Sequence, residues 1–167
     1  EALSFIKNSV DKEEPFFCMI APNAPHSPFN VPKAWQDRYR DSGEPETYQR
    51  FMGMVSNIDH NVGILRARLE EWGLEQNTIV VFTSDHGDLC GEHGRDNKGV
   101  PMEGSARIPF LVHAPGVVPP GTVVREALGT VDFKPTILAL LGVANPGTDE
   151  GRDASALFRT GRAPDGW

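Results

Sequence analysis

Apolar residues follow two different spacings along the chain, and the first of them is helical. From 45 to 72 they recur at steps of three, four and one, so they share one face of a long amphipathic helix. The segment VDFKPTILALLGV (131–143) predicts a shorter helix that ends near Gly142. The opening residues, EALSFIKNSV, form a third, short amphipathic stretch.

The second spacing is that of strands. The runs PFFCMIA (15–21), TIVVFTS (78–84) and IPFLVHA (108–114) are short, apolar and rich in β-branched or aromatic residues, which predicts buried strands. In chain order the elements are strand, helix, strand, loop, strand and helix. This order predicts an α/β layered domain with a mostly parallel sheet.

The loops between these elements are where we expect function. PNAPHSPFNVP (22–32) contains four prolines, which exclude both a helix and a hydrogen-bonded strand. The other loop, 85–107, is Gly-rich and charged. Both loops follow strands, and ligands of α/β sheets bind beyond the carboxyl ends of the strands. The tail, 144–167, is rich in Gly, Pro, Asp and Arg and shows no clear period.

Composition excludes some classes of function. The 167 residues suffice for one domain, and 23 acidic against 16 basic residues give a formal charge of −7. This balance argues against a nucleic-acid binder, which normally carries a basic patch. No run approaches the roughly 20 apolar residues of a membrane span, and no signal peptide is visible. Cys18 and Cys90 are too few for a disulfide framework.

Candidate metal ligands follow the second predicted strand, where TIVVFTS leads into Asp85, His86 and Gly87. An adjacent carboxylate and imidazole can reach one metal ion if the backbone turns between them, and Gly87 permits that turn. Asp85 suits any hard cation, whereas His86 suits manganese or zinc better than calcium. The alternative is that Asp85 caps the loop and His86 is a solvated side chain.

Two further residues could handle an anion. Lys98, in DNKGVPMEGSARIP, can place a compact positive charge against an anionic oxygen. His26, held between prolines in NAPHSP, can donate to an oxygen and act as a general acid. Taken alone, each is better interpreted as an ordinary loop residue. Combined with Asp85 and His86, they predict a cation and an oxyanion site, as phosphoryl or sulfuryl transfer requires.

A nucleophile is missing from this set. The chain has no G-x-S-x-G elbow and no P-loop, and neither Cys18 nor Cys90 has a neighbouring His and acid. The hydroxyls of Thr83, Ser84 and Ser105 stand in no catalytic motif. The residues alone therefore predict half of a catalytic site.

Three stretches carry a resemblance to a known family. They are PFFCMIAPNAPHSPFNVPKAW (15–35), YQRFMGMVSNIDHNVGILRARLEEWGLEQNTIVVFTSDHGDLCGEHG (48–94) and KGVPMEGSARIPFLVHAPG (98–116). Together they resemble the second half of a sulfatase catalytic domain, in the alkaline-phosphatase-like superfamily. The resemblance implies that 1–167 is the C-terminal portion of such a domain. The implied fold is an incomplete α/β/α layered domain with a mostly parallel, mixed sheet.

The resemblance also implies roles for the candidate residues. Asp85 and His86 match two of the family's metal ligands, Lys98 matches the lysine that contacts the sulfate, and His26 matches the histidine that contacts sulfate or assists the leaving group. The resemblance implies a divalent metal, with calcium as the first candidate. Because many sulfatases have Asn where this chain has His86, manganese is the alternative.

Other parts of the family's machinery are not in this chain. The nucleophile of sulfatases is a formylglycine made in a C-x-P-S-R-like or S-x-P-S-R-like motif, which belongs to a preceding portion, and a small C-terminal subdomain follows. The resemblance thus implies a sulfuric ester hydrolase acting on a small-molecule or carbohydrate sulfate ester, inactive as this chain alone. Partners among nucleic acids or membranes are not expected, and a periplasmic or secreted location would fit the family. The alternatives are a phosphonate or phosphodiester hydrolase and a non-catalytic truncated relative.

Overall fold

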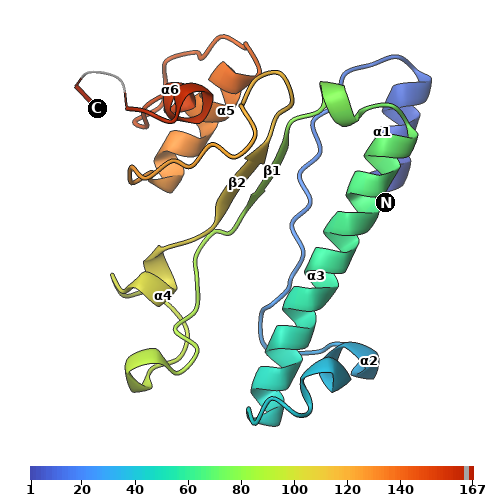
Figure 1. Cartoon of the computed structure of the whole chain (residues 1–167), viewed down its shortest axis with the longest axis vertical. Helices are drawn as coiled ribbons and strands as arrows, with labels where there is room; N and C mark the ends of the chain where they lie inside the picture. The colour runs from blue at the N-terminus through green and yellow to red at the C-terminus, as the bar shows by residue number, and fades with distance from the viewer. Residues whose placement is uncertain (164–165) are drawn as a thin grey trace. The chain divides into compact units, whose positions relative to one another are not determined.

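The computed structural model describes residues 1–163 and 166–167, in two compact units, Glu1–Glu75 and Gln76–Trp167. The first unit contains the helices α1 (Ala2–Asp11), α2 (Lys33–Gln36) and α3 (Glu46–Glu71). The second contains the strands β1 (Val80–Thr83) and β2 (Phe110–His113) and the helices α4 (Glu103–Ala106), α5 (Phe133–Leu140) and α6 (Ser155–Thr160) (Figure 1). Short 3₁₀ turns are η1 (Asp37–Tyr39), η2 (Glu75–Asn77), η3 (Glu92–Gly94) and η4 (Thr130–Asp132).

Helix α3 is the long amphipathic helix that the apolar spacing predicts, and its 26 residues form the spine of the first unit. Helix α2 packs against it, with the ring of Trp35 centred 5.2 Å from that of His60. The loop before α2 is fixed in the same way, because Phe29 meets Phe51 of α3 edge-on at 5.7 Å. Side-chain packing on α3 therefore positions the Pro-rich loop.

Residues 15–21 do not form the buried strand that their apolar run predicts. The segment has no regular secondary structure, and Phe17 and Met19 are 78 % and 79 % exposed. An apolar run indicates that a segment can be buried, but a strand also needs a neighbour that pairs with its backbone groups. The described residues provide no such neighbour for 15–21.

The two strands of the second unit lie within the runs that predict them. They pair with each other in an antiparallel sheet, in which Val80 lies opposite His113. The sequence predicts a mostly parallel, mixed sheet, whereas the described residues contain this antiparallel pair and no parallel one. The loop that leaves β1 returns to β2 and carries three of the candidate site residues.

The core of the second unit is built by α5 and α6 against the sheet. Ala154 and Leu157 are fully buried, and Phe158 lies beside them. Phe110 of β2 stacks on Phe133 at 4.2 Å and meets Phe158 edge-on at 5.5 Å. Helix α5 is the short helix expected in 131–143, whereas α6 lies in the tail, where the sequence shows no period.

Backbone groups of the tail are bound by side chains at the start of α5. Asp132 accepts hydrogen bonds from the backbone N–H of Arg152 at 2.8 Å and of Gly129 at 2.9 Å. These N–H groups, that of Arg152 first, hold the pKa of the Asp132 carboxyl below its ordinary value of 3.8. The hydroxyl of Thr136 accepts a third bond, from Ala154 N at 3.0 Å.

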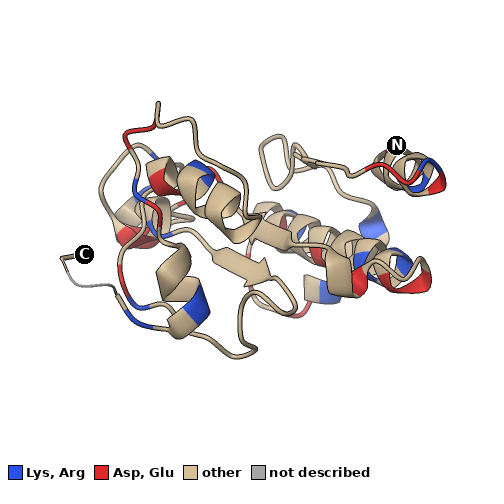
Figure 2. Ribbon diagram, turned by 90° about the horizontal axis from the view of Figure 1, so that it is seen from above, with Lys and Arg blue, Asp and Glu red and all other residues tan. Residues whose placement is uncertain are grey.

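Charged residues of both signs are interspersed along the ribbon, and over the described residues neither sign forms a continuous run (Figure 2). Among the helices of these residues, none combines the length and the apolar character that crossing a membrane requires.

Candidate functional site

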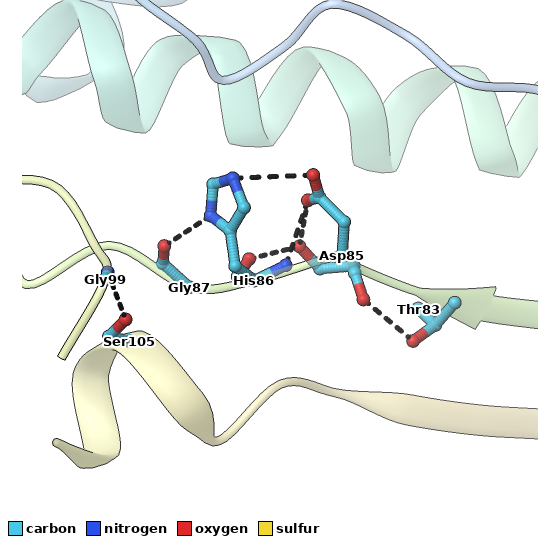
Figure 3. A network of polar contacts seen from close by, with 7 residues as sticks. Thr83, Asp85, His86, Gly87, Gly99 and Ser105 are labelled. Atoms are coloured by element: carbon cyan, nitrogen blue, oxygen red, sulfur yellow. Dashed lines mark hydrogen bonds and ion pairs between the residues drawn. The ribbon is translucent and has the colours of Figure 1, made fainter. Parts of the chain in front are cut away.

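The imidazole of His86 is oriented by its own backbone. Its Nδ1 lies 2.8 Å from the carbonyl oxygen of Gly87, and because a carbonyl only accepts, Nδ1 carries the proton of the neutral ring. Nε2 then bears the lone pair, and it lies 3.4 Å from Oδ2 of Asp85 (Figure 3). Histidines that bind metals usually donate their other N–H to a carbonyl or carboxylate in this way.

Two acceptor atoms thus face each other across 3.4 Å. The pair is repulsive unless positive charge lies between them, either a proton on Nε2 or a cation. Both atoms could bind a single cation at the usual bond lengths of about 2.0–2.6 Å. The side chains of Asp85 and His86 are 84 % and 39 % exposed, so an ion can reach them from solution.

Asp85 also caps its own turn. Its Oδ1 accepts the backbone N–H of His86 at 2.9 Å and lies 3.5 Å from the Ser84 hydroxyl. Desolvation alone would raise the pKa of the Asp85 carboxyl, but the hydrogen bond from His86 N and the positive charge that the His86 ring carries when protonated hold that pKa below 3.8. The two interpretations of Asp85 are therefore compatible, since Oδ1 caps the turn and Oδ2 faces His86.

The donor set fits part of a metal site. One carboxylate oxygen and one imidazole nitrogen suit manganese, and the oxygen suits calcium. Over the described residues, no group of three or more His, Cys, Asp or Glu side chains is placed to hold a metal ion. Asp85 and His86 therefore supply two ligands and leave the rest of a coordination shell to other groups.

Ser105 links the turn after His86 to the turn after Lys98. Its carbonyl accepts the N–H of Gly87 at 2.9 Å. Its buried hydroxyl accepts the N–H of Gly99 at 3.3 Å, the contact drawn between these two residues in Figure 3. The backbone next to Lys98 is therefore fixed, while the side chain of Lys98 is exposed. No local sequence motif predicts that Ser105 links these two turns, because the turns are far apart in the sequence.

The loop closes only because Gly87 has no side chain. A Cβ at this position would lie 2.1 Å from the carbonyl oxygen of Gly104, far inside van der Waals contact. The glycine is therefore required by a close approach of two backbones, a requirement distinct from the turn expected there. Asp88 holds the next part of the loop, where its Oδ1 accepts the N–H groups of Cys90 at 2.9 Å and Asn97 at 3.2 Å.

His26 belongs to the first unit. It lies between two cis peptide bonds, Ala24–Pro25 and Ser27–Pro28, and is exposed. Its Nδ1 lies 2.7 Å from the Ser27 carbonyl oxygen, so Nε2 is left for an external partner, as it is in His86. The structure thus gathers Asp85, His86 and Lys98 in one loop of the second unit and places His26 in the Pro-rich loop of the first.

The chain is similar to sulfatases in sequence and in structure. The family model described as Sulfatase matches residues 1–143. An arylsulfatase from Clostridium perfringens is 32 % identical over 95 % of this chain and 40 % of its own length. A crystal structure from Bacteroides fragilis, described as a sulfatase candidate, gives a TM-score of 0.88 at 28 % identity over 98 % of this chain. The alkaline-phosphatase-like fold expected from the sequence is confirmed.

Other similar structures differ in what they act on. One, with a TM-score of 0.67 and 30 % identity over 81 % of this chain, is described in complex with its substrate D-glucosamine-2-N,6-O-disulfate. A phosphonate monoester hydrolase from Agrobacterium radiobacter gives a TM-score of 0.64 at 28 % identity over 73 % of this chain. The chain spans about 40 % or less of the length of the relatives and structures named here.

Proposed function

Because the chain belongs to the sulfatase family, we propose that it is the C-terminal portion of a catalytic domain that hydrolyses sulfate esters. The observation that supports this most directly is the fixed pair of ligand atoms, Asp85 Oδ2 and His86 Nε2, 3.4 Å apart in the loop after β1. This pair lies within the part of the chain that matches the family. Such a pair could supply two ligands of a cation site in the loop after β1, and loops that follow strands are where α/β enzymes bind their ligands.

Asp85 and His86 are proposed to hold a divalent cation, with calcium as the first candidate and manganese as the second. When bound, the cation supplies positive charge that stabilises the negative charge developing on the sulfate group. Because the pKa of the Asp85 carboxyl lies below its ordinary value, the carboxylate is ionised and ready to bind a cation throughout the neutral range. The Gly87 carbonyl keeps the proton of His86 on the nitrogen that faces away from the cation.

Lys98 and His26 are proposed to act on the ester itself. The exposed ammonium of Lys98 would neutralise charge on a sulfate oxygen, and the fixed turns on either side of it limit where that charge can lie. His26 would bind a sulfate oxygen or donate a proton from Nε2 to the leaving oxygen, because its Nδ1 is already engaged with the backbone.

The nucleophile is proposed to come from outside residues 1–167. Sulfatases use a formylglycine, and neither Cys18 nor Cys90 stands in the motif from which it is made. We therefore expect the isolated chain not to turn over. The substrate is proposed to be a small-molecule or carbohydrate sulfate ester, the class that the description of a similar structure in complex with a disulfated glucosamine supports.

The test of Lys98 uses the full-length protein and 4-nitrophenyl sulfate. Lys98→Ala should lower kcat/KM by about 100-fold, the scale for losing one charge-stabilising group. Lys12→Ala removes an equally exposed lysine from the first unit and should leave the rate unchanged. A loss of less than about 3-fold in Lys98→Ala would remove Lys98 from the site.

The test of the cation site is binding of Ca²⁺ and Mn²⁺ measured by isothermal titration calorimetry. Asp85→Ala and His86→Ala should each weaken binding at least about 10-fold. Asp96→Ala changes an exposed carboxylate of the same loop and serves as the matched control. Equal affinities in all four proteins would show that the metal binds elsewhere.

A second candidate function is hydrolysis of phosphonate monoesters. It is favoured by His86, which stands where many sulfatases have Asn, and by the similarity to the Agrobacterium enzyme. Rates on 4-nitrophenyl sulfate and 4-nitrophenyl phenylphosphonate, measured on one preparation, separate the two. Binding of metal with no turnover of either ester would identify a non-catalytic relative.

A further inference from the structure

An open groove of about 600 Å³ lies in the first unit, bounded by the end of the Pro-rich loop, α2 and the start of α3. Helix α2 lies against the N-terminal end of α3 (Figure 1). Residues of both helices line the groove. Its volume falls within the range of about 300–1,000 Å³ that small-molecule sites have. The candidate site residues His26, Asp85, His86 and Lys98 are not among its lining residues.

Three of the residues that line the groove are apolar. They are Phe29, Val31 and Pro32, all in the loop before α2. The ring of Phe29 packs edge-on against Phe51 of α3. An aromatic ring beside aliphatic groups is a surface on which the C–H face of a sugar ring can pack.

The polar residues of the lining supply both donors and acceptors. Glu46 accepts hydrogen bonds from Arg50 at 2.7 Å and from Gln36 at 3.3 Å, and the hydrogen bond from Arg50 is the main reason why the pKa of Glu46 lies below 4.5. Arg50, Gln36 and Asn30 all line the groove, and their side chains have further N–H groups and amide oxygens.

Charge in the groove is compensated locally. Arg50 is paired with Glu46, and Lys33 is paired with Asp37. A sulfate or carboxylate placed here would meet the ionised Glu46 and gain little from cations that already have partners. A hydroxyl-rich ring meets no such repulsion, and each hydroxyl both donates and accepts.

We propose that this groove is a subsite for an uncharged sugar unit of a glycan substrate. The proposal rests on the proposed sulfatase function, for which it names the part of the substrate bound beside the ester. Asn30 follows His26 by four residues, so their Cα atoms are at most about 14 Å apart. A short oligosaccharide with its sulfate at His26 can therefore reach the groove.

Binding of sulfate-free oligosaccharides tests the groove without any hydrolysis. Two probes are titrated into the full-length protein, and their binding is measured by calorimetry. One is neocarrahexaose, a galactan hexasaccharide, in its desulfated form, and the other is a short oligomer of N-acetylglucosamine. At least one should bind, and Arg50→Ala should weaken it about 10-fold, the loss expected for hydrogen bonds to a charged group. Affinity should change little between low and high salt, because the ligand carries no charge.

Arg68→Ala is the matched control. Arg68 lies on the same helix and is paired with Glu71, at an exposure like that of Arg50 with Glu46. Its loss should leave glycan affinity unchanged, and both variants should keep the helical circular dichroism of the parent. If Arg68→Ala weakens binding as much as Arg50→Ala, or if neither oligosaccharide binds, the proposed subsite is wrong. Binding of inorganic sulfate that Arg50→Ala abolishes would also overturn the assignment to a neutral sugar.

Hydrolysis separates this proposal from the function on which it rests. Arg50→Ala should raise KM about 10-fold for a sulfated oligosaccharide and leave 4-nitrophenyl sulfate unaffected, since that ester has no sugar. An unchanged KM for the sulfated oligosaccharide would contradict the subsite while the sulfatase activity stands. Absence of any hydrolysis, with Arg50-dependent glycan binding retained, would refute the proposed function and leave the groove as a sugar site.

Discussion

The apolar run 15–21 and the tail 144–167 differ in burial in a way that their apolar content does not predict. The run is continuously apolar and predicts a buried strand, yet Phe17, Met19 and Ile20 are exposed. The tail shows no period, yet it contains α6, whose Leu157 and Phe158 lie in the core of the second unit. Apolar content therefore did not decide which of the two segments is buried.

The difference in burial follows from the hydrogen-bond partners that each segment finds for its backbone. The tail passes so close to the start of α5 that a Cβ at Gly151 would lie 1.9 Å from the carbonyl oxygen of Val131. Its backbone N–H groups are bound by Asp132 and Thr136, so burial leaves them satisfied. Residues 15–21 have no sheet partner among the described residues, and burying unpaired backbone groups would be unfavourable.

The largest effect should come from removing core volume in the tail. Leu157→Ala empties a site at the centre of the second unit and should lower the free energy of unfolding by about 2–5 kcal/mol, as for other buried leucines. Urea unfolding of this variant is compared with that of Leu141→Ala, in which the leucine is half-exposed. Equal small losses in both would show that α6 is not held in the core.

Asp132→Asn should have the next largest effect. Both carboxylate oxygens of Asp132 accept N–H groups, and an amide can accept only one of them, so we expect a loss of about 2–3 kcal/mol. Because the folded-state pKa of Asp132 is lowered, its stabilisation is present above 3.8 and is lost as pH falls through the folded pKa. The measurement is the unfolding free energy of both proteins from neutral pH to below 3.8, with the exposed Asp96→Asn as control. A difference that stays constant with pH would assign the effect to packing.

Thr136→Val should have a smaller effect on the same contact. The valine keeps the shape of the side chain but leaves the N–H of Ala154 without its acceptor in a buried position, at a cost of about 1–2 kcal/mol. The measurement is urea unfolding beside that of Thr148→Val, which changes an exposed threonine of the tail. A stabilised Thr136→Val protein would mean that the tail does not depend on this hydrogen bond.

The local spacing of apolar residues predicted two helices and two strands of the structure. The helical spacing of 45–72, the strands at 78–84 and 108–114 and the helix within 131–143 are all confirmed. The missed helix α6 has six residues, too few for a period to show, and it is held by contacts with distant residues. A strand at 15–21 failed because strand formation depends on a neighbour that no local pattern reveals.

In the candidate site, too, the sequence identified some residues and missed one whose role depends on distant contacts. The sequence identified Asp85, His86 and Lys98 as residues of one loop, because the type and spacing of these residues can be read directly from it. It did not identify Ser105, because its two hydrogen bonds join parts of the loop that are far apart in sequence. The metal and anion roles of all four candidate residues, His26 included, stay predictions.

The smallest effect should come from the exposed run, and it tests the comparison most directly. Phe17→Ser replaces a large apolar side chain that is mostly in water, so the free energy of unfolding of residues 1–167 should change by no more than about 0.5 kcal/mol. Phe158→Ser makes the same exchange in the core and should be severely destabilising. Unfolding is followed at two protein concentrations, because an exposed apolar segment can associate with a second copy. A cost in Phe17→Ser near that in Phe158→Ser, independent of concentration, would mean that 15–21 is buried within its own chain. The sequence pattern would then have been the better guide to this segment.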